Sequence, residues 1–276
     1  MARSAPMATL LVLLAVGTAH AQGCGEVLSV TTATAGELRA AFVPPARTPA
    51  TTLLLLPGGD GHAALDSTGC PQRLQGNSLI RSMPLFQAAG LGTLLVDAPA
   101  RHQGGDGLGA YRTDVDHAAD LGRLITAVRE RTGGTVWVAG TSRGAISAAN
   151  AAARLQGRAA PDGVVLTSAV VAGDPRARKP WVAQSVFDLP LQAIVQPLLV
   201  IGHAQDRCLR SPPTEMDRVV SSTRSARAQA VTVRGGAVDE GAARVDACEG
   251  RSAHGFIGQE AEVADGIVRF VRGQRY

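Results

Sequence analysis

The segment Gly140-Thr141-Ser142-Arg143-Gly144 has the residue types and the spacing of a serine nucleophile held on a tight turn. The pattern G-x-S-x-G is weak evidence alone, but here it follows the apolar run Thr135–Ala139 and precedes the alanine-rich run Ala145–Leu155. A strand before and a helix after such a turn would project the hydroxyl above a sheet, with glycines where the two elements approach. The alternative is an ordinary strand–helix turn capped by a serine. We therefore predict that Ser142 is a nucleophile.

A general base must activate this hydroxyl, because serine is a poor nucleophile at its ordinary pKa. On turns of this kind the acid and then the histidine follow the serine along the chain. Two histidines follow Ser142, namely His203 and His254. We predict that His254 is the base, because it lies in a loop before the last predicted helix, whereas His203 sits just before the predicted acid. A surface histidine without a function is the alternative.

The acid should follow the penultimate strand, and Asp206 stands a few residues after the apolar run Pro197–Ile201. From there its carboxylate could orient the imidazole and stabilise the imidazolium that forms during attack. The rival carboxylates come after the final predicted strand: Asp239, Glu240 and Asp246. We therefore predict a triad of Ser142, Asp206 and His254.

An acyl-transfer site also needs two backbone N–H groups that stabilise the oxyanion. We predict one from Arg143, directly after the nucleophile, and one from Gly59, with Asp60 as the second choice. The run Gly58-Gly59-Asp60-Gly61 would let the backbone approach a ligand closely. It has neither the Lys-Ser/Thr ending of a P-loop nor the G-x-G-x-x-G spacing of a dinucleotide site. The cysteine and histidine spacing does not suggest zinc, so we predict no metal and no cofactor.

A sheet must position these residues, and apolar runs bounded by turn residues indicate its strands. Apolar runs without alternation suit strands that are covered on both faces, as in a parallel sheet. The predicted strands are Thr51–Leu56, Leu91–Val96, Thr135–Ala139, Gly163–Leu166, Pro197–Ile201 and Ala228–Val233. Helices are predicted over Asp114–Arg131, Ala145–Leu155 and Gln259–Arg272, and an antiparallel edge pair over Glu26–Val43. This alternation predicts an α/β fold with a mostly parallel, doubly wound sheet and helices on both faces.

The amino-terminal residues have the features of a secretory signal. Arg3 precedes the apolar run Ala8–Val16, and Ala19-His20-Ala21 has the small-x-small spacing of a cleavage site. We predict a signal peptide over residues 1–21 and a single domain over residues 22–276, exported to the periplasm or secreted. The apolar run is shorter than the about 20 residues that cross a bilayer, so no stable membrane insertion is expected. A lipid anchor at Cys24 is less favoured, because Gln22 stands where a lipidation site has a small residue.

Four cysteines in an exported chain suggest two disulfides, for which three connectivities are possible. Cys208 lies two residues after Asp206, and Cys248 lies six residues before His254. A bond between Cys208 and Cys248 would hold the acid loop beside the base loop, and Cys24 and Cys70 would then pair. We take this pairing as a hypothesis.

The charge pattern bears on the class of partner. The formal net charge is +4, acidic and basic residues are mixed along the chain, and aromatic residues make up 3% of it. A nucleic-acid-binding surface has a basic stripe with stacking aromatics, so no nucleic-acid partner is predicted. The predicted partner is a small-molecule acyl substrate, and no oligomeric state is predicted.

Across nearly the whole predicted mature chain, the sequence resembles the α/β-hydrolase superfamily, and within it a group of bacterial exported α/β-hydrolases of undefined substrate. The matching segments are Leu56-Pro57-Gly58-Gly59-Asp60-Gly61, Asn77–Ser82, Val96–Pro99, Val138–Gly144, Asp206–Cys208 and Ser252–Phe256. The resemblance implies the α/β-hydrolase fold together with the triad and the oxyanion loop given above. The stretch between Ser168 and Pro197 is too short for a large cap domain.

The expected activity is hydrolysis of a carboxylic ester, or of a thioester or amide, through an acyl-Ser142 intermediate, as in a carboxylesterase. The alternatives are a peptidase of the same fold and a non-catalytic binding protein that retains the fold. Asn77 and Arg81 follow the oxyanion loop and could line the site. The preferred interpretation is structural, with Arg81 in a buried ion pair with Asp97, since such pairs are common.

Overall fold

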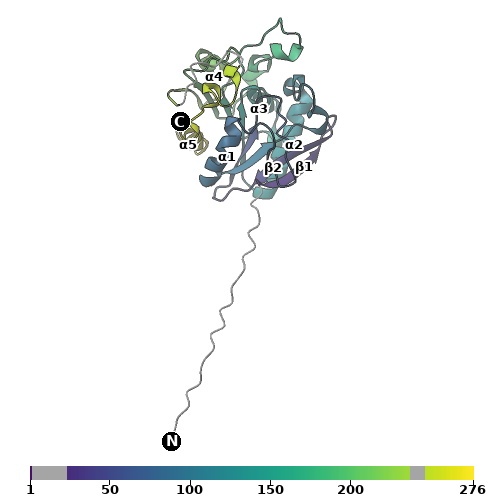
Figure 1. Ribbon diagram of the computed structural model, residues 1–276, viewed down its shortest axis with the longest axis vertical. Helices are drawn as coiled ribbons and strands as arrows, with labels where there is room; N and C mark the ends of the chain where they lie inside the picture. Colours follow the sequence, from purple (N-terminus) through teal and green to yellow (C-terminus); the bar gives the residue numbers. More distant parts are fainter. Residues whose placement is uncertain (2–23, 237–245) are drawn as a thin grey trace.

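The computed structural model describes Met1, residues 24–236 and residues 246–276 (Figure 1). Beyond Met1, the predicted signal peptide lies outside the described residues, as do Asp239 and Glu240. The strands are β1 (Glu26–Thr31), β2 (Glu37–Val43), β3 (Thr51–Leu56), β4 (Gly92–Val96), β5 (Thr135–Thr141), β6 (Gly163–Thr167), β7 (Leu198–His203) and β8 (Ala228–Val233). The α-helices are α1 (Ser78–Ala88), α2 (Val115–Thr132), α3 (Arg143–Arg154), α4 (Met216–Ser221) and α5 (Glu260–Val271).

The described strands form one eight-stranded sheet in the order β1-β2-β4-β3-β5-β6-β7-β8. Neighbours from β4 to β8 are parallel, whereas β1 pairs with β2, and β2 with β4, in antiparallel fashion. The predicted mostly parallel sheet with an antiparallel edge is confirmed. In this register Leu56 of β3 is paired with Gly140 of β5, and Thr141 with Thr167 of β6. The carboxyl ends of three central strands therefore meet at one edge, where ligands bind in open α/β sheets.

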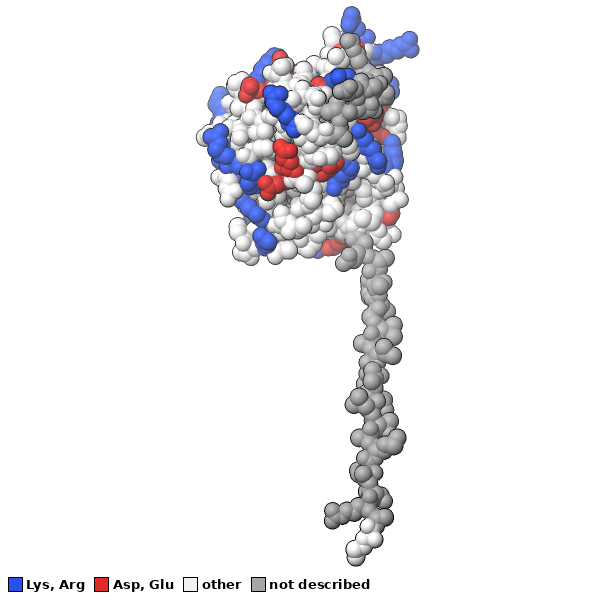
Figure 2. Space-filling model, turned by 60° about the vertical axis from the view of Figure 1, so that its left-hand side comes forward, with Lys and Arg blue, Asp and Glu red and all other residues white. Residues whose placement is uncertain are grey.

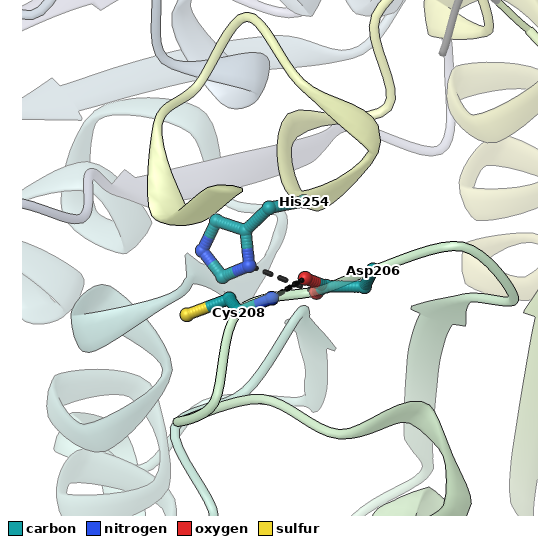
Figure 3. A group of neighbouring side chains, drawn as sticks. All are labelled: Asp206, Cys208 and His254. Carbon is teal, nitrogen blue, oxygen red and sulfur yellow. Dashed lines mark hydrogen bonds and ion pairs between the residues drawn. The ribbon is translucent and has the colours of Figure 1, made fainter. Parts of the chain in front are cut away.

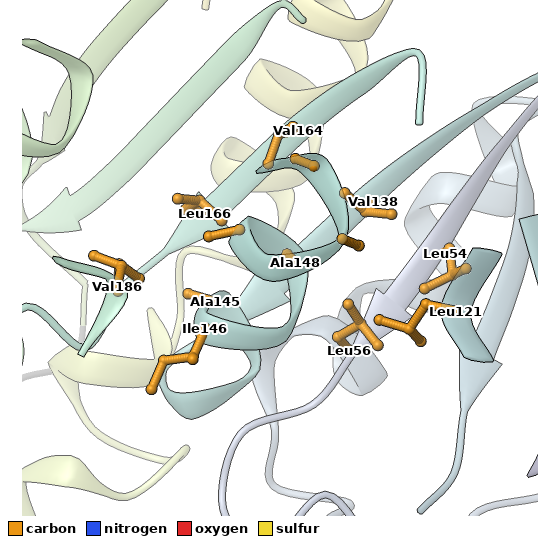
Figure 4. Close-up of a cluster of buried hydrophobic side chains, with 14 of the residues drawn as sticks. Leu54, Leu56, Leu121, Val138, Ala145, Ile146, Ala148, Val164, Leu166 and Val186 are labelled. Carbon is orange, nitrogen blue, oxygen red and sulfur yellow. The ribbon is translucent and has the colours of Figure 1, made fainter. Parts of the chain in front are cut away.

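Helices cover both faces of the sheet, because the strand side chains are apolar in both directions. Leu54 and Leu56 point into one core together with α2, α3 and α4 (Figure 4). Leu53 and Leu55 point into the other, against α1 and α5. Burial on both faces explains why these strands are continuous apolar runs without alternation.

Helix α1 was not predicted from the sequence, although its signals are present. Asn77 caps it, since the Asn77 side chain accepts a hydrogen bond from the Leu79 N–H at 3.1 Å. Leu79, Ile80, Met83 and Phe86 are buried along one side of the helix. Pro84 stands inside it and obscures the helical pattern. The other unpredicted helix, α4, is a short one next to β7.

Residues 168–197, between β6 and β7, contain no large cap domain. In this stretch the chain forms only short 3₁₀ turns, at Pro180–Ala183, Val186–Asp188 and Leu191–Ala193. Other 3₁₀ turns lie at Ala100–His102, Ala110–Thr113, Gly157–Ala159, Pro213–Glu215, Asp246–Cys248 and Ala253–Gly255. The expectation of a sheet without a large cap is confirmed.

The surface view in Figure 2 shows Lys and Arg side chains interspersed with Asp and Glu, without a continuous stripe of either sign on that face. Within the described residues, no helix has the length and apolar character that a membrane span needs.

The stability of this fold should depend on the two-faced core. Replacing Leu166 of β6, which is fully buried, by alanine should lower the free energy of unfolding by about 2–5 kcal/mol. The matched control is Leu209→Ala, because the Leu209 side chain is 66% exposed and its loss should cost little. Urea unfolding monitored by circular dichroism measures both. Equal losses in the two variants would contradict the assignment of the core.

Candidate active site

Ser142 occupies a strained turn between β5 and α3. Its backbone dihedrals are φ 52° and ψ −122°, outside the regions that side chains with a Cβ ordinarily adopt. The Ser142 N–H donates to the carbonyl of Thr167 on the neighbouring strand β6 at 2.9 Å, which fixes the turn against the sheet. Strain of this kind persists only where the surrounding structure enforces it, and it concentrates at functional sites.

The glycines on either side of Ser142 are required by close packing of backbone on backbone. A Cβ on Gly144 would lie 2.0 Å from the Leu56 carbonyl oxygen of β3. A Cβ on Gly140 would lie 2.3 Å from the Gly144 carbonyl oxygen. No side chain fits in either place, so the G-x-S-x-G pattern follows from how tightly α3 starts against the end of β3.

His254 and Asp206 form a buried hydrogen-bonded pair (Figure 3). Nδ1 of His254 lies 2.8 Å from Oδ2 of Asp206, and the two residues are 2% and 8% exposed. Since the carboxylate accepts at Nδ1, the neutral imidazole carries its proton there and presents Nε2 as an acceptor. Nε2 is buried and has no hydrogen-bond partner among the described residues.

Local hydrogen bonds hold the acid and base loops in place. The Cys208 N–H donates to Oδ1 of Asp206 at 2.8 Å, and this bond orients the carboxylate. Ser252 caps the short turn at Ala253–Gly255, since its hydroxyl accepts from the His254 N–H at 3.1 Å. The Ser168 hydroxyl, at the end of β6, donates to the His254 carbonyl at 2.7 Å. The base is thereby attached to the same sheet edge as the nucleophile.

Ser142 and His254 line one cavity of about 370 Å³. Its wall consists mainly of glycines and short polar side chains, together with the charged residues Glu249 and Arg251 and one large apolar residue, Leu74. Gly59, one of the predicted oxyanion-hole residues, also lines it. The structure therefore brings all three predicted triad residues and the oxyanion loop to the same edge of the sheet.

The predicted oxyanion loop, Gly58–Gly61, approaches Ser142 closely. A Cβ on Gly58 would lie 3.0 Å from the Ser142 Cβ and 3.6 Å from its Oγ. Gly59 has φ +60°, a conformation that favours glycine. The Arg143 N–H is in the first turn of α3, where N–H groups have no acceptor within the helix. The Arg143 side chain stacks on Trp181, with its guanidinium carbon 3.9 Å from the ring centroid.

The expected pair between Arg81 and Asp97 is wrong. Arg81 instead pairs with Glu260 of α5 at 2.8 Å and donates to the carbonyls of Gly250 and Gly255, each at 2.7 Å. It also donates to the Gly76 carbonyl. Arg81 is thus structural, as expected, but it connects α1 to the base loop and to α5. Asn77, the residue that caps α1, lines the cavity that contains Ser142 and His254.

Asp97 has a different set of partners because it stands at the end of β4, next to a run of free N–H groups. Its two oxygens accept from the N–H groups of Ala63, Leu65 and Ala98 at 2.7–3.0 Å. His62 Nδ1 lies 3.0 Å from its Oδ1. A buried carboxylate satisfied in this way needs no arginine.

Two disulfides are present, Cys24–Cys70 and Cys208–Cys248. The first joins the residue before β1 to the loop that follows the oxyanion loop. The second joins the acid loop to the segment before His254, and Cys248 lines the cavity. Both are compatible with an oxidising compartment.

Asp206, Cys208 and His254 also satisfy a distance test for a metal site, since one ligand atom of each lies within 4.8 Å of the others. The residues do not fit a metal. The Cys208 sulfur is in a disulfide, so it offers no thiolate, and Nδ1 of His254 is hydrogen-bonded to the carboxylate. The arrangement is that of an imidazole oriented by an acid.

The structure contains a second serine–histidine pair that was not predicted. His117 Nε2 of α2 lies 2.8 Å from the Ser147 hydroxyl of α3, and Arg112 Nη1 donates to the same hydroxyl at 2.8 Å. In the sequence, His117 falls on the apolar stripe of α2 with Leu121 and Leu124, which marks it as a buried residue. Ser147 is fully buried, whereas Ser142 borders the cavity, so the second pair is not positioned to attack a substrate.

Burial of His117 should make the protein sensitive to acid. Burial, with the nearby Arg112 charge, lowers the pKa of His117 from 6.5 to about 3. Between these values the unfolded chain binds a proton that the folded chain does not, so the free energy of unfolding falls as the pH drops through this window. His117→Gln should reduce this dependence by up to about 1.4 kcal/mol per pH unit.

Urea unfolding of the two proteins at about pH 6 and about pH 4 measures the difference. His102→Gln is the control, since it makes the same change outside the buried pair. If the wild type and His117→Gln lose stability in parallel, the buried neutral state of His117 is contradicted.

No protein-family model and no curated protein matches the chain significantly. Solved structures do match. Est1E from Butyrivibrio proteoclasticus is 14% identical over 91% of this chain and 99% of its own, with a TM-score of 0.60. The esterase Est2 from Thermogutta terrifontis, in its butyrate-bound form, is 15% identical over 91% and 95%, with a TM-score of 0.57. An α/β serine hydrolase without a lid from Xanthomonas campestris is 18% identical over 86% and 93%, with a TM-score of 0.51. The chain therefore has the α/β-hydrolase fold.

Proposed function

We propose that this chain is a serine hydrolase that cleaves carboxylic esters through an acyl-Ser142 intermediate. The observation that carries the proposal is the combination of a strained serine and a buried His254–Asp206 pair on one cavity. The esterases and serine hydrolases among the structural neighbours support a hydrolase of this fold.

In the proposed reaction, Nε2 of His254 takes the Ser142 hydroxyl proton while Oγ attacks the ester carbonyl carbon. The carbonyl electron pair moves to the oxygen, and the N–H groups of Gly59 and Arg143 stabilise the resulting oxyanion. The imidazolium then gives its proton to the leaving alkoxide. Asp206 keeps the proton on Nδ1 and stabilises the imidazolium. Water attacks the acyl-serine by the same steps and releases the acid.

The cavity favours a short acyl group. A long alkyl chain would need an apolar channel, yet Leu74 is the one large apolar residue of a wall that otherwise holds glycines, polar residues and the charged residues Glu249 and Arg251. The adjoining apolar space, between α1 and α5, has a volume of about 10 Å³, which is about enough for one water molecule. The butyrate bound to the neighbouring esterase has a short chain of this kind. We propose small esters of short acids as substrates.

Export is part of the same proposal. The two disulfides fit an oxidising compartment, and the amino-terminal segment has the order of charged, apolar and small residues that a signal peptide needs. The proposed location is the periplasm or the exterior of the cell.

Ser142 should carry the whole reaction. A fluorophosphonate should label it, and Ser142→Ala should abolish labelling and lower kcat for a p-nitrophenyl ester by about 10⁴-fold or more. The control is Ser221→Ala, which removes an exposed hydroxyl on α4 and should leave both unchanged. Peptide mapping of the labelled protein and ester assays are the measurements.

The results also separate the alternatives. A folded wild type that takes no label and cleaves no ester would leave a binding protein with this fold. Faster cleavage of aminoacyl arylamides than of short esters would favour a peptidase. A decline in rate from acetyl to longer acyl esters is expected from the cavity, and a rise would contradict the short-acyl proposal.

The Cys208–Cys248 bond should support the triad geometry. Replacing both cysteines by serine should lower kcat by about tenfold to a hundredfold, because small displacements of His254 relative to Asp206 weaken catalysis. The matched variant, Cys24→Ser with Cys70→Ser, removes the bond remote from the triad and should keep kcat within about twofold.

Both double variants should lose free energy of unfolding, by about 2–4 kcal/mol. Thermal unfolding and ester assays on the purified proteins distinguish the two effects. Equal kcat in the two variants would show that the second disulfide only stabilises the fold.

A further inference from the structure

Arg112 is a fully buried arginine whose side chain reaches the oxyanion loop. It belongs to the short turn Ala110–Thr113 before α2, and it is 1% exposed. Nη2 donates to the carbonyl of Pro57 at 3.1 Å and lies 3.5 Å from the carbonyl of Gly59. Nη1 donates to the Ser147 hydroxyl of α3 at 2.8 Å.

The charge on Arg112 is not matched by a carboxylate in contact. Within the described part of the chain no Asp or Glu lies at ion-pair distance from it, although the Asp60 carboxylate attracts its charge from farther away, and its Nε has no hydrogen-bond partner. Burial lowers the pKa of Arg112. A guanidinium nevertheless keeps its proton in proteins at neutral pH. Removing such a cation from water costs free energy, and buried charges of this kind are often found at functional sites.

A chain of polar groups fixes the Arg112 side chain to the helix that bears the nucleophile. The Ser147 hydroxyl accepts from Arg112 and is also hydrogen-bonded to Nε2 of His117, so it attaches the guanidinium to both helices, α2 and α3. The Asn150 side chain, also on α3, donates to the Arg112 carbonyl at 3.0 Å. Arg112 is therefore held relative to Ser142, at the start of the same helix.

Arg112 contacts the carbonyl ends of the oxyanion-loop peptides. In a trans peptide the C=O and the N–H point in opposite directions. The Pro57 carbonyl shares its peptide with the Gly58 N–H, and the Gly59 carbonyl shares its peptide with the Asp60 N–H. Between them, the Gly58 carbonyl accepts from the Gly61 N–H at 3.1 Å. Arg112 thus holds the carbonyls on either side of the Gly58–Gly59 peptide, and the Gly61 N–H holds the carbonyl of that peptide.

The loop leaves no room for a different arrangement. A Cβ on Gly61 would lie 2.8 Å from Arg112 Nη2 and 2.5 Å from the Leu108 side chain. On the opposite side, a Cβ on Gly58 would touch Ser142. The loop is therefore confined between the guanidinium and the nucleophile.

We propose that Arg112 is the positioning residue of the oxyanion hole: it holds the loop carbonyls away from Ser142, and its buried charge stabilises the oxyanion on the far side of those peptides. The inference rests on the proposed hydrolase function. It assigns a role to a residue that touches neither substrate nor triad. Preorganised dipoles and charges in a dry site act strongly on such an anion.

The test compares Arg112→Met, which removes the donors and the charge, with Arg112→Lys, which keeps the charge. The probe is an aryl trifluoromethyl ketone. Ser142 Oγ adds to its carbonyl carbon, the carbonyl electron pair moves to oxygen, and His254 takes the serine proton. The hemiketal oxyanion then occupies the proposed hole.

Arg112→Met should lower kcat for a p-nitrophenyl acetate substrate by about tenfold to a hundredfold and leave KM within about twofold. The inhibition constant of the ketone should rise by the same factor as kcat falls, and Arg112→Lys should recover part of both. Thermal unfolding establishes that the variants are folded. A folded Arg112→Met with unchanged kcat would overturn the proposal, as would a loss of kcat without a matching loss of ketone affinity.

If Arg112→Met does not fold, Arg112→Lys and Ser147→Ala serve instead. Ser147→Ala removes the hydroxyl that holds the guanidinium, and it should shift kcat and ketone affinity together by about threefold or more. Unchanged kcat and unchanged ketone affinity in both variants would overturn the proposal. If the wild type takes no fluorophosphonate label, the proposed function itself is contradicted. If the wild type is labelled and active but the Arg112 variants keep its kcat and ketone affinity, only this inference is contradicted.

Discussion

The contact between the start of α3 and the end of β3 is the constraint on which the site depends. At Gly144 the helix backbone approaches the Leu56 carbonyl so closely that a Cβ would lie 2.0 Å from it. This packing forces the chain through a sharp bend, and Ser142 takes the positive φ that the bend requires. The same approach puts the loop after β3 beside the serine. One packing contact thereby positions both the proposed nucleophile and the proposed oxyanion loop.

The base is positioned by contacts of a different kind, from segments remote in the sequence. The loop that carries His254 has little regular structure, so it depends on hydrogen bonds and on the Cys208–Cys248 bond. Arg81 adds a further connection, because it holds two carbonyls of this loop to α1 and pairs with Glu260. The His254–Asp206 pair is buried, so separating the two side chains would leave an unpaired charge away from water at a high cost in free energy. The contacts that hold the loop in place prevent this separation.

Several buried polar groups near the site are hydrogen-bonded to one another or to the backbone, whereas Nε2 of His254 and Nε of Arg112 have no partner among the described residues. Asp97 accepts hydrogen bonds from backbone N–H groups, and His117 and Ser147 are hydrogen-bonded to each other. Their hydrogen bonds are directional, so they fix the orientation of the backbone around the site. The hydrophobic effect is not directional and cannot fix this orientation. The small polar cavity is the basis for proposing small substrates, and a cap domain that would add an apolar channel is absent between β6 and β7.

Much of the architecture could be predicted because it follows from local patterns. Continuous apolar runs indicated buried parallel strands, and the two runs within Glu26–Val43, around Ala35-Gly36, indicated the edge pair. The glycines around Ser142 indicated a tight strand–helix turn. Helix α1 was missed because Pro84 interrupts its pattern, although Asn77 gave a cap signal.

The sequence by itself determined the fold class, the turn that bears Ser142 and the order of the candidate acid and base. Tertiary structure alone decided which charges meet. Arg81 turned to Glu260 rather than Asp97, and Arg112 reached the oxyanion loop across many intervening residues. The physical reason is that strand and helix patterns arise from the periodicity of neighbouring residues, whereas a buried ionic group takes the partners that the packed elements bring within hydrogen-bond distance.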